Sequence, residues 1–342
     1  MRKFLFTASV LMLSMALFGQ QNELVKPKKI KSEKIKDTTA YKINAVPVIS
    51  IFTNFHVGFG KESKKTGFGL DRSYLGVRVN FMKNLYARVV FDIGLPGVEG
   101  ASLDRVAYVK HAFLGWTPGK FTLNAGLIKL EQFDVQEKFW GYRYIYKSFQ
   151  DAYDFGSSAD LGVMVSYKFT KWISADISFT NGEGYKKLNM NNRFKYSAAV
   201  TLNPVESLTA RIYYDRADKE IGDTLGKAQE NIALFLGYKH RWFSIAAEYN
   251  NLFNQNYQRD KNKWGASGYF SVKLPKNFTI FGRYDYLTSN GNWAYEEDGQ
   301  FAIVGFEYAP IKYVKISPNF RAWIPKQQKA KLYFYLNLLV AM

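Results

Sequence analysis

Apolar and polar residues alternate along successive segments of about ten residues from Val46 to the end of the chain. A period of two is typical of β-strands whose two faces meet different surroundings. In the segment 72–81 the two faces separate into apolar and polar sets: Leu75, Val77, Val79 and Phe81 against Arg72, Tyr74, Arg78 and Asn80. The segments 85–93 and 208–215 repeat this arrangement, and 331–342 has the pattern of a closing strand. The alternation predicts strands with one face suited to lipid and the other to water.

Tyrosine and tryptophan gather at the ends of the predicted strands, at Trp116, Tyr167, Trp172, Tyr238, Trp242, Tyr249, Tyr284, Tyr286, Tyr308 and Tyr313. A soluble β-sandwich also alternates, but it does not need such rings at nearly every strand end. Membrane barrels place these amphipathic rings at the level of the lipid headgroups. We therefore predict an all-β chain that forms a transmembrane antiparallel β-barrel over residues 46–342.

The breaks between the predicted strands alternate in length. Short turns are expected at 82–84, 117–120, 170–171, 203–206, 240–241, 275–277 and 309–310. Longer polar loops are expected at 60–67, 95–104, 131–158, 181–192, 216–228, 250–262, 287–298 and 323–330. Bacterial barrels have short periplasmic turns and long outer loops. Seven turns and eight loops predict sixteen strands with both chain ends at the periplasmic side, and fourteen or eighteen strands are the alternatives.

The first 45 residues lack this alternation. Arg2 and Lys3 precede an apolar run from Phe4 to Phe18, which predicts a secretory signal peptide over 1–20. A membrane-anchoring helix is the weaker alternative, because it needs roughly 20 apolar residues. Residues 21–45 are rich in lysine and poor in apolar residues, so we expect a flexible periplasmic tail. This tail is either a solvated leader or a segment that binds a partner or plugs a pore.

Composition narrows the classes of function. The chain has 47 Lys and Arg against 29 Asp and Glu, with an isoelectric point near 9.6, but its predicted export argues against nucleic-acid binding. With no cysteine and only His56, His111 and His240, we find neither a metal-binding pattern nor a plausible catalytic pairing. We expect no cofactor and no enzymatic activity.

Three motifs resemble the phosphate-selective porin O and P family. They are Phe68-Gly-Leu-Asp-Arg72-Ser-Tyr74-Leu75-Gly76, then Ala107-Tyr108-Val109-Lys110 followed by Gly126-Leu-Ile-Lys129, and Ser157-Ser158-Ala159-Asp160-Leu161-Gly162-Val163. Together they cover the first half of the predicted barrel. The resemblance implies a bacterial outer-membrane barrel of sixteen strands that is often a homotrimer. It also implies a constricted lumen lined by basic residues, among them Lys129.

The polar faces carry a surplus of basic residues. They hold Arg72, Arg78, Arg88, Lys110, Lys168, Arg193, Lys195, Arg211, Lys239, Lys273, Arg283, Lys315 and Arg321 against Asp92, Asp176, Asp215, Glu248, Asp285 and Glu307. The long segment 131–158, which contains Arg143, is expected to fold into the channel and set its constriction, or else to cap the barrel outside. Pairs such as Arg211 with Asp215 and Arg283 with Asp285 are the alternative to a free positive field.

These observations predict an outer-membrane porin for passive diffusion of small solutes, with a preference for anions such as phosphate. The candidate pore-lining residues are Arg72, Arg78, Arg88, Lys110, Lys129, Arg143, Arg211 and Arg283. Rings of basic residues select anions in this way. Membrane lipid and lipopolysaccharide are the expected partners. The alternative is a structural or adhesin barrel with a closed lumen.

Overall fold

The computed structural model describes residues 42–342, apart from 61, 97–104, 188–192 and 295. The predicted signal peptide (1–20) and most of the predicted tail (21–45) lie outside the described residues. The first strand begins at Asn44, two residues before the expected start of the barrel.

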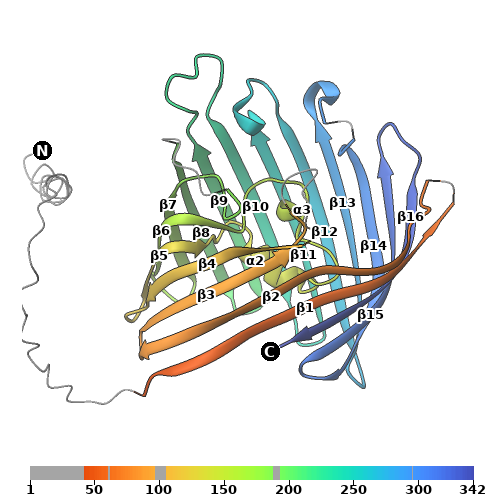
Figure 1. Ribbon diagram of the computed structural model, residues 1–342, viewed down its shortest axis with the longest axis horizontal. Helices are drawn as coiled ribbons and strands as arrows, with labels where there is room; N and C mark the ends of the chain where they lie inside the picture. Colours follow the sequence, from red (N-terminus) through yellow and green to blue (C-terminus); the bar gives the residue numbers. More distant parts are fainter. Residues whose placement is uncertain (1–41, 61, 97–104, 188–192, 295) are drawn as a thin grey trace, which may run out of the picture. The chain divides into compact units, whose positions relative to one another are not determined.

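The described residues form sixteen antiparallel strands (Figure 1). The strands are β1 (Asn44–Phe59), β2 (Thr66–Met82), β3 (Leu85–Gly94), β4 (Val106–Trp116), β5 (Phe121–Lys129), β6 (Ala159–Lys168), β7 (Ile173–Thr180), β8 (Lys195–Val205), β9 (Leu208–Ala217), β10 (Gln229–Lys239), β11 (Phe243–Phe253), β12 (Lys263–Leu274), β13 (Phe278–Ser289), β14 (Gly299–Ile311), β15 (Val314–Pro325) and β16 (Lys331–Ala341). Four short helices lie in the loops: α2 (Asp134–Trp140), α3 (Phe149–Ala152), η1 (Gln255–Tyr257) and η2 (Asn290–Asn292). The predicted fold class and strand number are confirmed.

Pairing of the first and last strands closes the barrel. β1 lies antiparallel to β16 from Ser50 opposite Ala341 to Phe59 opposite Leu332. Each strand pairs with its neighbours in the sequence on both sides, so the sheet has no open edge. Closure satisfies the backbone polar groups within the sheet, which a lipid environment demands.

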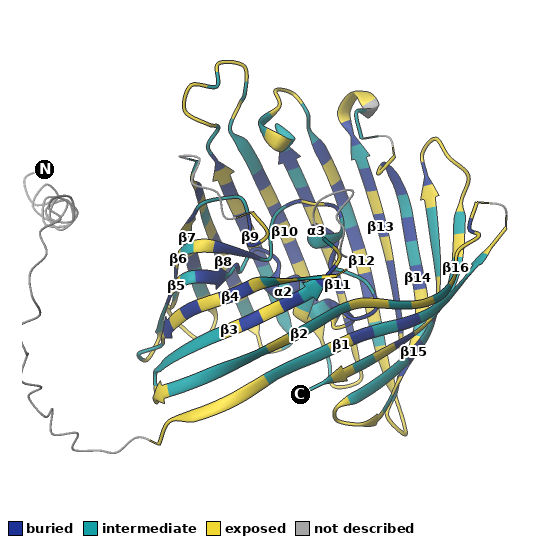
Figure 2. Cartoon of the chain, viewed as in Figure 1, coloured by how far each residue is buried: buried dark blue, intermediate teal, exposed yellow. Residues whose placement is uncertain are grey.

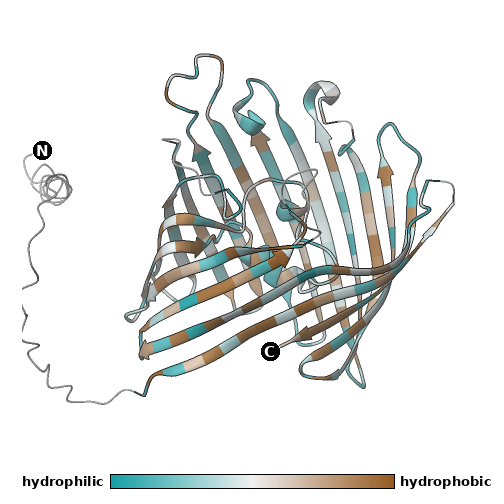
Figure 3. Cartoon of the chain, viewed as in Figure 1, coloured by the Kyte–Doolittle hydropathy of each residue, from teal (hydrophilic) through white to brown (hydrophobic). Residues whose placement is uncertain are grey.

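Alternating side chains separate the two faces of the wall. Along β10, Ile232, Leu234 and Leu236 are exposed on the outside, whereas Ala233 and Phe235 are buried on the inside. Figures 2 and 3 show the same alternation of buried and exposed, and of polar and apolar, positions on most strands. No helix among the described residues is long and apolar enough to cross a membrane.

An extra residue interrupts the alternation in β4 and another does so in β2. Val90 and Phe91 of β3 lie opposite His111 and Val109 of β4. Lys110, between those two β4 residues, has no partner in β3 and is the extra residue of a β-bulge. In β2, Asp71 is the extra residue, because Phe52 of β1 pairs with Arg72 and Thr53 pairs with Leu70. A bulge turns two consecutive side chains toward one face of a sheet.

The expected turn at 309–310 is misplaced. β14 continues through Ile311, and the turn consists of Lys312 and Tyr313. Pro310 lies where the register between β14 and β15 shifts. Proline cannot donate a hydrogen bond to the ladder, so it is accommodated at such an irregularity and need not end the strand.

Candidate pore and constriction

The segment 130–158, here called the constriction loop, lies inside the barrel with α2 and α3 (Figure 1). Its two ends are joined by a hydrogen bond from Leu130 N to Ser158 O of 3.1 Å. This position inside the barrel agrees with the prediction that the long connection enters the channel. The alternative of an external cap does not fit the contacts that the loop makes.

Aromatic residues fix the constriction loop to one side of the lumen. Trp140, Phe149 and Phe155 are almost fully buried. Tyr142 stacks on Phe281 of β13 with ring centroids 4.3 Å apart, and Tyr146 stacks on Phe301 of β14 at 4.4 Å. The loop therefore covers the wall formed by β10 to β14 and builds a small apolar core within the lumen.

Polar contacts complete this attachment. Arg283 donates to Lys147 O at 2.6 Å, and the Tyr144 hydroxyl donates to Glu307 at 2.8 Å. Arg211 donates to Glu131 O at 3.0 Å, close to the start of the loop. These contacts satisfy polar groups that the loop shields from water.

Two of the predicted pore-lining residues are therefore covered by the constriction loop. Arg211 and Arg283 are 3% and 4% exposed. Arg283 pairs with Asp285 at 2.7 Å, as the ion-pair alternative expects. Arg211 pairs with Asp176 of β7 at 2.7 Å and not with Asp215, which instead binds Lys195 at 3.0 Å. Both arginines hold the loop in place.

On the opposite side of the lumen, basic side chains line two cavities. A cavity of about 300 Å³ is lined by residues of β1 to β5 and of the constriction loop. Its basic residues are Arg88, Lys110, Lys129 and Arg143. A second cavity of about 450 Å³ contains Arg72 and Lys147. The two cavities share Leu130 and Ser158, so they adjoin where the constriction loop begins and ends.

The β4 bulge supplies two neighbouring groups to the smaller cavity. Both Lys110 and His111 line it, although consecutive residues of a regular strand would point to opposite faces. Neither ring nitrogen of His111 has a hydrogen-bond partner within the described residues. His111 lies inside β4, and the extra residue Lys110 before it turns its side chain to the lumen.

A residue that the sequence analysis missed helps to define the constriction. Tyr185, from the connection between β7 and β8, reaches Asp92 with its hydroxyl at 2.5 Å. Asp92 also forms an ion pair with Arg72 at 2.6 Å. The ammonium group of Lys110 lies 4.7 Å from the ring centre of Tyr74 and 5.3 Å from that of Tyr185. A tyrosine in a loop carries no sequence signal of this inward position.

Acidic residues of the constriction loop neutralise part of the basic charge. Asp134 pairs with Lys129 and Lys138, and Arg143 pairs with Asp151 at 2.8 Å. Burial alone would raise the pKa of Asp151, but Arg143 and Lys147 outweigh it and lower the pKa. Burial alone would likewise lower the pKa of Arg143, but Tyr74, Asp151 and Glu137 raise it. Both groups are therefore charged at neutral pH.

Three of the predicted residues form no ion pair with any described residue. Arg78 stacks 3.8 Å over the ring of Tyr86 and donates to Asn80, and Arg88 and Lys110 line the smaller cavity. Of the eight predicted residues, the structure therefore brings Arg72, Arg88, Lys110, Lys129 and Arg143 to the two cavities, with Arg78 on the same wall. The remaining charge at this wall is positive.

The histidines do not gather into one site. His56 accepts or donates a hydrogen bond with Asn54 at 2.9 Å in β1, His111 lies in β4, and His240 lies after β10. No group of three or more His, Cys, Asp or Glu side chains suited to a metal ion occurs within the part of the chain that the structure describes.

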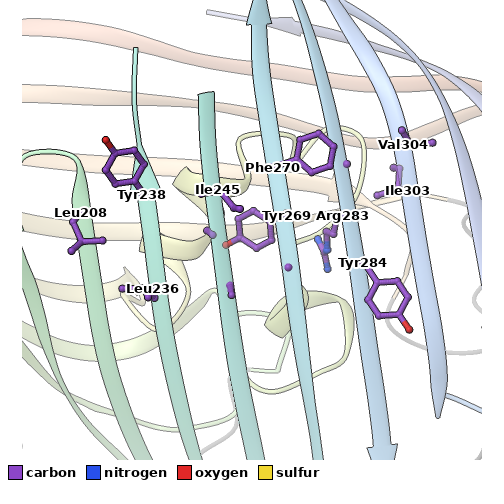
Figure 4. A pocket seen from close by; sticks show the side chains of 14 residues that line it. Leu208, Leu236, Tyr238, Ile245, Tyr269, Phe270, Arg283, Tyr284, Ile303 and Val304 are labelled. Atoms are coloured by element: carbon purple, nitrogen blue, oxygen red, sulfur yellow. The ribbon is translucent and has the colours of Figure 1, made fainter. Parts of the chain in front are cut away.

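A separate hollow lies on the outer wall, away from the pore. It measures about 620 Å³ and is lined mainly by apolar residues of β10 to β14 (Figure 4). Its lining includes the small residues Ala247, Gly268 and Gly282 and the larger Phe270, Tyr284 and Val304. Lipid bathes this face of a membrane barrel, so we do not assign the hollow to the conduit.

A closed sixteen-stranded barrel with a loop folded into its lumen is the architecture of an outer-membrane porin. Residues 153–329, slightly more than half of the chain, match the model of the family described as "Putative beta-barrel porin-2, OmpL-like". The chain belongs to this family and is a porin of the bacterial outer membrane. The motif resemblance to a porin is thereby supported, while its phosphate-selective part stays a hypothesis.

Solved structures share the fold at low sequence identity. A Salmonella typhi OmpF structure, in complex with daunomycin, has a TM-score of 0.67 at 11% identity and aligns over 88% of this chain and 97% of that one. OmpT, an outer membrane protein of Vibrio cholerae, gives 0.63 at 13% identity over 89% and 99%. The outer membrane channel DcaP of Acinetobacter baumannii gives 0.56 at 12% identity over 88% and 97%. No curated protein matches the chain in sequence.

Proposed function

We propose that this porin is a passive diffusion channel for small solutes with a preference for anions. The observation that carries the proposal is the distribution of charge across the lumen. Arg88 and Lys110 line the smaller cavity without an ion-pair partner among the described residues, next to Arg72, Lys129 and Arg143. Two basic residues covered by the constriction loop, Arg211 and Arg283, are neutralised by carboxylates.

The physical basis is the field of fixed charges in a narrow passage. A cleft lined by one sign of charge, with walls of low dielectric constant, produces potentials of several kT and concentrates ions of the opposite sign. In the smaller cavity four basic residues face only Asp134 and Glu137. Asp134 is already engaged by Lys129 and Lys138. A small anion entering this cavity therefore meets a positive potential.

Phosphate is the proposed solute within this class. The support is the motif resemblance to phosphate-selective porins, which includes Arg72, Lys110 and Lys129. Each of these side chains lines one of the two cavities. Arginine and lysine are the side chains that bind phosphate oxygens through charge-assisted hydrogen bonds.

A homotrimer is the proposed assembly, and lipopolysaccharide the proposed surface partner. A similar structure, the OmpT of Vibrio cholerae, is described as a trimer form.

We also propose that the protein is not an enzyme, since its three histidines lie in separate parts of the wall. Joint replacement of His56, His111 and His240 should then leave conductance intact and abolish no hydrolytic activity.

The test is the reversal potential of single channels in a planar bilayer under a KCl gradient, with and without phosphate. We expect a chloride-selective current that phosphate reduces. The double variant R88Q/K110Q should lose most of this selectivity, while K227Q/K329Q, changed in outer loops, should keep it. A cation-selective current would reject the charge assignment, and the absence of any conductance would reject the channel and favour a structural barrel.

A further inference from the structure

The short turns at the periplasmic rim carry a charge pattern that conduction does not require. Their basic residues are Lys83, Lys120, Lys171, Arg241, Lys276 and Lys312, against the single acid Glu206. All six basic side chains are exposed. None of them forms an ion pair with a residue that the structure describes. The rim therefore presents uncompensated positive charge at the membrane surface.

Exposed rings accompany three of these cations. Lys171, Arg241 and Lys312 lie over the rings of the residues that follow them, Trp172, Trp242 and Tyr313, at 5.3, 5.2 and 5.4 Å. Each of these rings is about half exposed. Tryptophan and tyrosine on a membrane barrel mark the level of the lipid headgroups. The cations thus lie at headgroup depth.

An open cavity lies between two neighbouring turns at this depth. The cavity, of about 620 Å³, lies between the turn joining β12 to β13 and the turn joining β14 to β15. Lys273, Lys276 and Lys312 line it, together with the apolar Leu274 and Ile311, which are 40% and 58% exposed. Its one acid, Glu307, is held by Lys315 at 3.0 Å. The cavity thus offers three ammonium groups, none in an ion pair with a described residue, beside a lipid-facing apolar surface.

The opposite rim differs in its charges. There, carboxylates lie among the basic residues and pair with some of them, as Glu220 does with Arg193 at 2.9 Å and Glu230 with Arg216 at 2.6 Å. The short turns contain only Glu206 as an acidic residue, and the inner leaflet of the membrane supplies phosphate groups at their level.

We propose that the cavity between these two turns binds an anionic glycerophospholipid of the inner leaflet. Lys276 and Lys312 hold the headgroup phosphate, and Lys273 adds charge from the lumen side. The first methylenes of the acyl chains lie on Leu274 and Ile311. Basic residues beside a membrane attract anionic lipid in this way. This partner is separate from the solute of the channel and depends only on the location of the protein in the outer membrane.

The test uses the full-length protein in nanodiscs with equal amounts of phosphatidylglycerol and phosphatidylcholine. After mild detergent extraction, native mass spectrometry counts the lipids that remain bound. We expect several-fold enrichment of phosphatidylglycerol on the wild type. The K276Q/K312Q variant should lose this enrichment, and the outer-loop control K227Q/K329Q should retain it.

Several outcomes would overturn the proposal. Equal retention of both lipids by the wild type would do so, as would undiminished enrichment on K276Q/K312Q. Displacement of the lipid by millimolar inorganic phosphate would assign the cavity to free phosphate instead. Heat-dependent electrophoretic mobility establishes that each variant is folded. Because the two lysines lie outside the constriction, unchanged anion selectivity in K276Q/K312Q separates this result from failure of the channel proposal.

Discussion

Single inserted residues determine which charged side chains point into the pore. Lys110 is an extra residue in β4, and the bulge that it forms turns Lys110 and His111 to the same side. Asp71 has the corresponding place in β2, directly before Arg72. One inserted residue in each strand thus changes the electrostatics of the constriction without changing the strand order.

Asp151 provides a test of how the constriction loop reduces the net positive charge of the constriction. A carboxyl group whose pKa is lowered in the folded protein stabilises the fold at every pH above its unfolded-state pKa of about 3.9. This stabilisation is lost only as the pH falls through the pKa of the folded state. We therefore expect the Arg143 to Asp151 ion pair, and its effect on selectivity, to persist from pH 7 to pH 5.

The D151N variant should instead raise the chloride preference at pH 7, by roughly two- to threefold, because one fixed charge near the path changes the local potential by the order of kT. Reversal potentials of the wild type and D151N at pH 7 and pH 5 measure both effects. A wild type whose selectivity changes strongly between these values would contradict the assigned role of Asp151.

The constriction loop is the element with the largest effect on the lumen. It buries Phe149 completely between Tyr153, Phe155 and the wall residues Leu252 and Leu287. The barrel closes through its own hydrogen-bond ladder, so loop attachment and wall stability are separate quantities. Weakening the apolar contact should free the loop and leave the barrel intact.

The F149A variant tests this separation. Removing a buried phenylalanine side chain costs about 3–5 kcal/mol in a well-packed core. We expect the loop to detach for part of the time, which should increase current noise and speed proteolysis within 131–158 at least tenfold. The control F169A removes an exposed ring after β6. Wild-type protease resistance of F149A would mean that the polar contacts alone hold the loop.

The strands and the loop differ in how far the sequence predicts them. Alternation of side chains follows from local geometry, so the sixteen strands and most turns were predictable. The partner of Arg211 was not, because Asp176 lies on β7, two strands away and 35 residues earlier. Nor could local pattern reveal that the aromatic residues of the constriction loop pack on β10 to β14, since those contacts depend on barrel closure.

At the scale of the whole molecule, the charge of the lumen acts as a field that salt can screen. The Debye length falls from about 10 Å at 0.1 M salt to about 3 Å at 1 M. Chloride preference, measured with a constant concentration ratio across the bilayer, should therefore decrease as KCl rises from 0.1 M to 1 M. A preference independent of salt would indicate direct binding or size exclusion in place of the long-range field.

The closely spaced ends of the constriction loop have an engineering consequence. Because Leu130 and Ser158 are already hydrogen-bonded, a short turn can join β5 to β6 in place of the entire insertion. The ladder of the wall would be unaltered, and water would solvate Arg211 and Arg283 where the loop now covers them. The product would be a wide-bore nanopore with a charged interior, a scaffold into which sensing peptides can be grafted between the same two residues.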